Sequence, residues 1–197
     1  MARTDTLANF LTDIANSVRA KTGSTEKIAV KNLDTEIANL ESDGGDPIAP
    51  ATLTFANYTG ETINEATIDT SNLTTMANMF SSCPNLKSVN MSTWNTSKVT
   101  SMRGMYSSCN NIQSITCGSI DTSKVTDMAY MFNDCSKLTS LNVSNFDTSN
   151  VTDMEYMFNH CATIKTLDLS NFNTSKVIKM NNMFSSCRSL TSINLSN

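Results

Sequence analysis

The stretch FDTSNVTDMEYMFNHCATIKTLDLSN, residues 146–171, is the clearest copy of a 26-residue unit that occurs five times, without a gap, over residues 68–197. Each copy has two Met columns, an aromatic column and a Cys column at the same places. These columns are Met76, Met102, Met128, Met154, Met180; Met79, Met105, Met131, Met157, Met183; Phe80, Tyr106, Phe132, Phe158, Phe184; and Cys83, Cys109, Cys135, Cys161, Cys187. A constant period gives every turn of the chain the same circumference, which predicts a solenoid of stacked copies.

The first half of each unit has the pattern of a short helix. In residues 146–171 apolar residues recur at steps of three and four, as on one face of an amphipathic helix. Thr152 and Glu155 have the spacing of a capping box, so we expect the helix to begin near them.

The second half of each unit has the pattern of a strand. Ile164, Leu167 and Leu169 form the L-x-x-L-x-L motif of a leucine-rich-repeat strand, and Asp168 should point outward between two inward leucines. Stacked units would then form a parallel sheet. The predicted fold is an α/β solenoid: a leucine-rich-repeat-like, right-handed coil of five 26-residue repeats, each with a short helix and a short parallel strand, preceded by an N-terminal helical segment.

The run MFxxCxxLxxLxLSNFDTSxVTDM resembles the repeat of the BspA-like leucine-rich-repeat family, found in surface proteins of bacteria and some protists and in proteins of phages. The resemblance covers residues 68–197. Four residues depart from the family pattern: Leu73 replaces Val, Tyr106 replaces Phe, Cys117 replaces a strand Leu, and Ile178 replaces the capping Thr. The resemblance implies a broad role in adhesion or recognition.

Three segments precede the repeats. Residues 51–67 contain Leu53, Phe55 and Tyr58 in an order that mimics the strand and the residue after it, so we interpret them as a degenerate N-terminal cap. Residues 42–50 have the Gly and Pro content of a linker. Residues 1–41 carry two helical patterns, which predict either an αα-hairpin or a coiled coil between copies of the chain. The apolar positions of these attachment helices are Leu7, Leu11, Ile14, Val18, Val30, Leu33, Ile37 and Leu40.

The N-terminal segment LANFLTDIANSVRAKTGSTEKIAVKNLDTEIANL also resembles a short module on tail and baseplate proteins of phages that infect Gram-positive bacteria. The stretch IANSVRAKTG and the following helix that ends in IANL carry this likeness. It implies a virion attachment module in front of a recognition module. No secretory leader is visible in the first residues, which agrees with a protein assembled inside its host.

Residue types that could carry chemistry have simpler structural interpretations. Five of the six cysteines recur at one column, so we expect buried free thiols rather than a zinc site or disulfides. The single histidine, His160, lacks converging partners in the sequence and should be an exposed variant. Asp69, Asp121 and Asp147, with Asn95 and Asn173 in the same column, should bond turn backbone. The sequence predicts no catalytic residue, no metal and no cofactor.

The outward strand positions are the predicted ligand-facing surface, which suits a glycan or an extended polar chain, or else is only solvated. These positions are Ser88, Asn90, Ser114, Thr116, Ser140, Asn142, Thr166, Asp168, Ser192 and Asn194. The net charge of −4 argues against nucleic acid as a partner. The sequence contains no run of about 18 apolar residues, so it predicts no membrane insertion.

Three functions agree with these observations. The first is a non-enzymatic phage tail or baseplate protein, such as a tail fibre or receptor-binding protein. It would bind other virion proteins and a host-surface glycan or protein, and would form a homo-oligomer, with a trimer as the first expectation. The second is a bacterial surface adhesin of the BspA-like family, and the third is a structural spacer. The expected location is the virion, assembled in the bacterial cytoplasm, or alternatively the bacterial cell surface.

Overall fold

The computed structural model describes residues 54–55, 58, 60–63, 70 and 72–196. The predicted N-terminal helices, with Leu7, Leu11, Ile14, Val18, Val30, Leu33, Ile37 and Leu40, lie outside the described residues. The predicted linker, residues 42–50, lies outside them too. Below, the units that begin at residues 68, 94, 120, 146 and 172 are called coils one to five.

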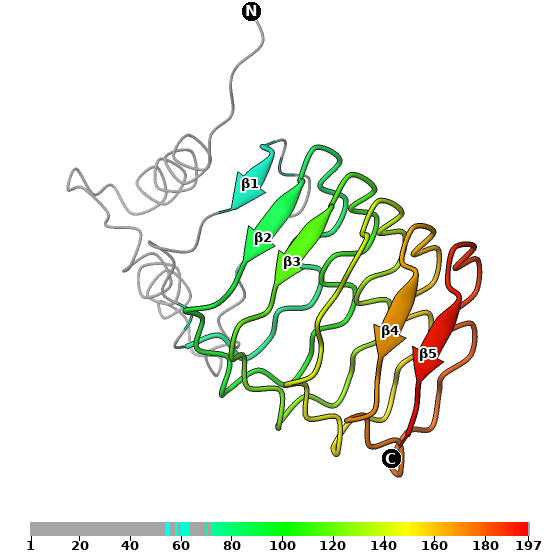
Figure 1. The fold of residues 1–197 in the computed structure, drawn as a ribbon. Helices are drawn as coiled ribbons and strands as arrows, with labels where there is room; N and C mark the ends of the chain where they lie inside the picture. The colour runs from blue at the N-terminus through cyan, green and yellow to red at the C-terminus, as the bar shows by residue number, and fades with distance from the viewer. Residues whose placement is uncertain (1–53, 56–57, 59, 64–69, 71, 197) are drawn as a thin grey trace, which may run out of the picture.

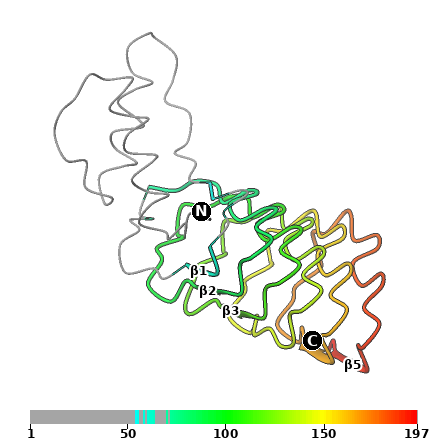
Figure 2. The same cartoon turned by 90° about the horizontal axis from the view of Figure 1, so that it is seen from above.

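The coils stack in one direction, each beside the next (Figures 1 and 2). Paired residues in adjacent coils are 26 positions apart, and the strand pairs among the described residues are all parallel, as Ser88 with Ser114 and Leu167 with Ile193. The strands are β1 (Thr62–Ile63), β2 (Ser88–Asn90), β3 (Ser114–Thr116), β4 (Thr166–Asp168) and β5 (Ser192–Asn194). The repeat fold expected from the sequence is therefore confirmed.

The sheet is interrupted at coil three, where a strand was expected. Strand β1 pairs with β2 and β2 with β3, whereas β4 pairs only with β5, and residues 140–142 form no strand. The break follows Gly118, which has φ of +59° and lies so close to coil one that an added Cβ would meet Ser92. We attribute the break to this local path, which departs from that of the other coils. A second ladder of single bridges continues through every coil, from Thr75 to Lys179, and keeps the stack in register.

The prediction of a short helix in each repeat is wrong for the described coils, which contain turns instead. Alternate backbone N–H groups donate to the next coil rather than within their own. In coil four, carbonyls of coil five accept from the N–H groups of Met154, Tyr156, Phe158 and His160. The N–H groups between them close short turns, as where Met157 donates to the carbonyl of Met154. A helix would need all these groups for its own i to i−4 bonds. The neighbouring coil thus replaces the helical hydrogen bonds.

The turns also require backbone angles that a helix excludes. Each described coil has two residues with positive φ four positions apart, for example Gly104 and Ser108 in coil two and Asn182 and Ser186 in coil five. Such turns bring every third side chain inward, which produces much of the spacing that an amphipathic helix has. Apolar periodicity could not distinguish the two structures.

The predicted capping box at Thr152 and Glu155 is also wrong. The Thr152 hydroxyl donates to the Thr126 carbonyl of the preceding coil, 3.1 Å away, rather than accepting from an N–H of its own turn. The N–H of Glu155 donates to the carboxylate of Asp153. The Thr at this column therefore joins coils instead of starting a helix.

A second Thr column, buried and not singled out in the sequence analysis, also joins the coils; it is the middle residue of the Asp-Thr-Ser motif. The Thr122 hydroxyl donates to the Asp147 carbonyl at 3.0 Å and accepts from the Asp147 N–H at 2.7 Å. Thr96 and Thr148 make the same pair of bonds to the next coil. One small side chain thus satisfies two backbone groups that would otherwise lack a partner.

The core lies between the strand ladder and the turns. In coils one to four both Met columns, the aromatic column and the Cys column are buried, as predicted. Rings of successive coils stack along the axis, with 5.8 Å between the centroids of Tyr106 and Phe132 and 5.5 Å between those of Phe132 and Phe158. In coil five Met180 is 46% exposed and Phe184 is only partly buried, because no described coil covers them.

The segment before coil one has a different register from the one predicted. Phe55 stacks on Phe80 and its N–H donates to the Met79 carbonyl, so Phe55 lies at the aromatic column and not in a strand. The strand that pairs with β2 is β1, several residues further on. Phe55 and Tyr58 are both buried against coil one.

Replacing Thr122 with Val should destabilise the chain by about 1–3 kcal/mol, because both the carbonyl and the N–H of Asp147 would be left without a partner. The measurement is urea unfolding followed by circular dichroism. Thr126→Val is the control, since that exposed hydroxyl only adds a bond of 3.3 Å to the Thr100 carbonyl. Equal losses for the two variants would show that the buried Thr column does not hold the coils together.

Candidate functional site

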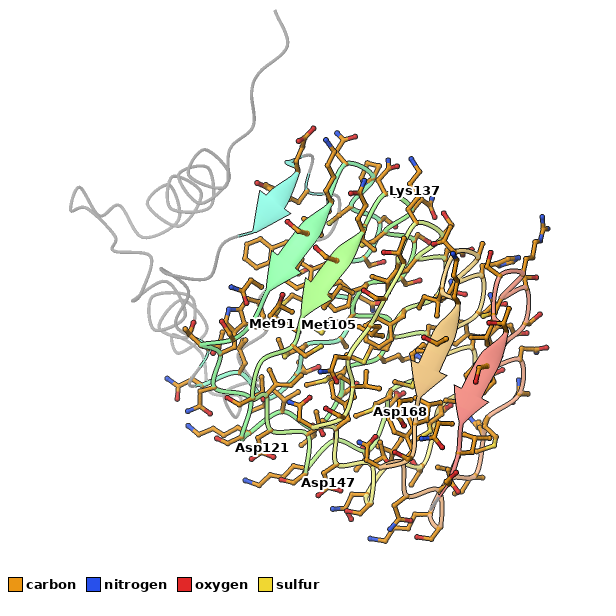
Figure 3. The ribbon with its side chains drawn as sticks, viewed as in Figure 1. Met91, Met105, Asp121, Lys137, Asp147 and Asp168 are labelled. Atoms are coloured by element: carbon orange, nitrogen blue, oxygen red, sulfur yellow. The ribbon has the colours of Figure 1, made fainter. Side chains whose placement is uncertain are left out.

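The predicted ligand-facing residues lie on the outer face of the strand ladder. The central residue of each of β2, β3 and β4 is buried, and the residues on either side of it are exposed or half-buried. Asp168, on β4, projects outward as expected (Figure 3). Ser140 and Asn142 are exposed although no strand forms there. The predicted residues thus form two rows of short polar side chains, called the strand-face rows below.

Part of the hydrogen-bonding capacity of these rows is used by the fold. The side-chain oxygens of Asn142, Asp168 and Asn194 each accept from the N–H two residues further on, at 3.0 to 3.2 Å. The Ser170 bonds to Asp168 lower the pKa of that carboxyl. The Asp168 carboxylate also accepts from the Asn194 side chain. These bonds hold the side chains of the row with Asn142, Asp168 and Asn194 in place before any ligand binds.

The Asp and Asn column at the start of each coil bonds turn backbone, as predicted. Asn95, Asp121, Asp147 and Asn173 each accept from the N–H two residues on, at distances from 2.9 to 3.1 Å. The Ser123 and Ser149 bonds lower the pKa of Asp121 and Asp147, respectively. Figure 3 places these two carboxylates along one edge of the stack. Asp69 lies outside the described residues. Among the residues described, no group of three or more His, Cys, Asp or Glu side chains could hold a metal.

The six cysteines are thiols rather than disulfides, and all but Cys187 are buried, which confirms the expectation of buried thiols. Each thiol of the Cys column donates to a carbonyl of the preceding coil or cap, as Cys109 to Phe80 at 2.9 Å and Cys161 to Phe132 at 3.2 Å. Burial raises the pKa of Cys117 to about 12 and raises those of Cys135, Cys161 and Cys187 as well. The column is therefore a set of neutral hydrogen-bond donors.

His160 is exposed, as predicted, but it has partners that the sequence did not suggest. Its Nδ1 lies 3.1 Å from a carboxylate oxygen of Asp134 and 3.2 Å from the side-chain amide nitrogen of Asn159. Asn159 in turn donates to Asn133 in the preceding coil. These contacts join coils three and four at the surface.

The structure adds a surface feature that the sequence analysis missed. Tyr130 and Tyr156 stack with 4.9 Å between ring centroids and 12° between ring planes. The Arg103 guanidinium lies over the Tyr130 ring, 5.0 Å from its centroid. These three residues, called the tyrosine stack below, come from coils two, three and four. The sequence did carry a signal for this feature: when the five repeats are aligned, the column with Tyr130 and Tyr156 holds Asn78, Gly104 and Asn182 in the other coils.

Charged side chains surround the tyrosine stack. Arg103 lies 3.5 Å from Asp127 and 3.7 Å from Asp153, and Lys179 lies 3.4 Å from Asp153. The Glu155 carboxylate accepts from the Asn181 amide at 2.5 Å. Burial and the negative charge of Glu155 raise the pKa of Tyr130. Asp127, Asp153 and Lys179 belong to the ladder of single bridges, and Arg103, Glu155 and Asn181 follow bridge residues by two positions. These groups therefore form a surface separate from the strand-face rows.

A protein-family model described as "Mycoplasma protein of unknown function, DUF285" matches residues 52–140 and 113–197, which together span the described coils and the segment before them. The chain belongs to this family. The DUF285 match supports the resemblance of residues 68–197 to BspA-like repeats. The likeness of the N-terminal segment to phage attachment modules is untested by it and stays a prediction.

Two further comparisons add little about function. A solved structure, the leucine-rich repeat protein TpLRR of T. pallidum, is similar with a TM-score of 0.47 and 13% identity, over 73% of this chain and 72% of that one. No curated protein matches this DUF285 chain. Among the described residues, no helix has the length and apolar character needed to cross a bilayer.

We expect the native thiols to react slowly with Ellman's reagent at pH 8, because burial keeps them neutral and only the thiolate is nucleophilic. Cys187, the one that is partly exposed, should react first. Denaturant without reductant should release six thiols. Cys187→Ser should remove the fastest phase and leave the others unchanged. Four or fewer thiols in denaturant would reveal disulfides and contradict the structure.

Proposed function

We propose that this chain is a non-enzymatic recognition protein that presents its stacked coils to a host cell surface, as a receptor-binding component of a phage tail or baseplate. The observation that carries the proposal is the strand-face rows: short hydroxyl, amide and carboxylate side chains, aligned by the 26-residue register over the coils. Such rows offer many hydrogen bonds and little apolar contact. They suit a polar, extended partner such as a glycan or an extended segment of protein.

The absence of catalytic activity is part of the proposal. Nucleophilic catalysis needs a nucleophile, a base and an orienting group within hydrogen-bond reach of one another. The thiols of the Cys column are donors to backbone carbonyls, and His160 lies at the surface beside Asp134. Those arrangements support a structural use of both residue types.

The phage assignment depends on the N-terminal segment. Its resemblance to attachment modules of tail and baseplate proteins supports a two-part protein, with residues 1–41 bound to other virion proteins and the coils exposed. In this proposal the helices also assemble the chain into a homo-oligomer, a trimer as the first expectation. The protein would be built into the virion in the bacterial cytoplasm.

A bacterial surface adhesin is the second candidate. The observation in its favour is the family description, which names Mycoplasma and therefore points to bacterial proteins. The recognition surface would be the same in both candidates, since the coils supply it. The two differ in what holds the N-terminal segment.

The surface proposal predicts that fluorescently labelled full-length chain binds whole cells of a Gram-positive host. Replacing both Asn142 and Asp168 with Arg should weaken this binding at least tenfold, because a long charged side chain would cover the strand-face rows. The matched control is Thr126→Arg, which adds the same side chain at an exposed position next to Asp127 of the ladder of single bridges. Equal binding by the double variant and the control would exclude the strand face as the receptor surface.

The assembly proposal predicts a trimer for the full-length chain in multi-angle light scattering. A truncated chain that begins at residue 51 should be monomeric, because the apolar positions of the two predicted helices would be missing. Monomers for both chains would remove the main support for an attachment module.

A further inference from the structure

The tyrosine stack is placed in a backbone conformation that its residue type disfavours. Tyr130 and Tyr156 have φ of 59° and 55°, in the left-handed region. The other coils have Asn78, Gly104 and Asn182 at this position, residue types that adopt this region more easily. Large aromatic side chains are therefore not what the turn itself requires.

The stack has one end with no further ring. Arg103 covers the Tyr130 ring on the side of coil two, and Tyr156 covers it on the side of coil four. The next residue of the column, in coil five, is Asn182, which is exposed and carries no ring. The series of stacked flat groups, Arg103, Tyr130 and Tyr156, thus ends at Tyr156. A ligand with a flat face could continue the series there.

Hydrogen-bonding groups lie beside that position. Glu155 and Asn181 are bonded to each other in coils four and five, and Asp153 and Lys179 pair in the same two coils. A carboxylate accepts from hydroxyl groups, while an amide or ammonium group donates to them. An aromatic ring with polar groups nearby offers a small molecule both an apolar face and hydrogen-bonding partners.

The charges decide the kind of ligand. The carboxylates of Asp127 and Asp153 pair with the cations of Arg103 and Lys179, and the Glu155 carboxylate accepts from the neutral Asn181 amide. These three carboxylates and two cations leave one negative charge in excess. A cationic ligand would compete with Arg103 and Lys179 for their carboxylates, and an anionic ligand would meet the excess negative charge. A neutral ligand with many hydroxyl groups and a flat C–H face avoids both costs.

We infer that Tyr130 and Tyr156, with Glu155 and Asn181, form a binding site for a neutral carbohydrate, which stacks a sugar ring against Tyr156 and exchanges hydrogen bonds with Glu155 and Asn181. The site lies beside the ladder of single bridges. It does not depend on the strand-face rows as a receptor surface, although both would serve recognition.

The test uses the full-length chain and five probes: maltohexaose, cellohexaose and chitohexaose as neutral sugars, hexagalacturonate as the anionic control and hexalysine as the cationic control. Binding is detected by saturation-transfer NMR and the Kd is measured by titration calorimetry. At least one neutral hexasaccharide should bind, and the charged probes should not. Tyr156→Asn should weaken binding at least tenfold, and Tyr130→Asn should weaken it as well, because the first ring supports the second.

The Asn variants are expected to fold, because Asn occupies this column with positive φ in coils one and five. Circular dichroism checks that they do. Lys137→Ala, at an exposed position that belongs to neither proposed surface, serves as the second control and should keep full sugar binding. Three results would overturn the inference: no neutral sugar binds, sugar binding survives both Tyr→Asn variants, or hexalysine binds where the sugars do not. If no neutral sugar binds while the double Arg variant of Asn142 and Asp168 still loses cell binding, the sugar site fails and the proposed function stands.

Discussion

The transfer of backbone hydrogen bonds from each coil to the next is the interaction on which the rest of the structure depends. Four alternate N–H groups in the turn half of a coil donate to the following coil, and the buried Thr hydroxyls add two more bonds nearby. Each bond requires partners 25 or 26 residues apart. A change of one residue in the length of any coil would therefore misalign every column beyond it. Cooperation between neighbours, rather than the stability of a single coil, maintains the fold.

The side chains in the core follow from that constraint. Because adjacent coils approach as closely as paired strands, the inward positions must suit copies of themselves in the next coil. Flat rings stack, flexible Met side chains fill the space beside them, and the Cys thiols donate to carbonyls of the preceding coil. Positions that break the pattern then stand out against a regular background. Gly118 coincides with the interrupted sheet, and Tyr130 and Tyr156 form a surface stack where other coils have Asn or Gly.

The two surfaces with a proposed binding role have different origins. The strand-face rows are present in every coil, so their character could be predicted from outward strand positions alone, although Ser140 and Asn142 lie outside any strand. The tyrosine stack depends on contacts between three coils. Its residues looked like unrelated variants along the chain, and only the stacking distance between Tyr130 and Tyr156 brings them together with Arg103. Membership of the DUF285 family assigns a ligand to neither surface.

The sequence by itself determined the period, the number of coils, the inward columns and the outward rows, because a gapless repeat allows only one stacking register and burial selects the apolar positions. It also determined that the Asp and Asn column bonds turn backbone, since that bond is local. Only the tertiary structure decided that the Met, Phe and Cys half forms turns. Both a helix and such turns place apolar side chains at steps of three and four. The choice between them depends on backbone groups of the neighbouring coil, which the spacing of side chains does not record.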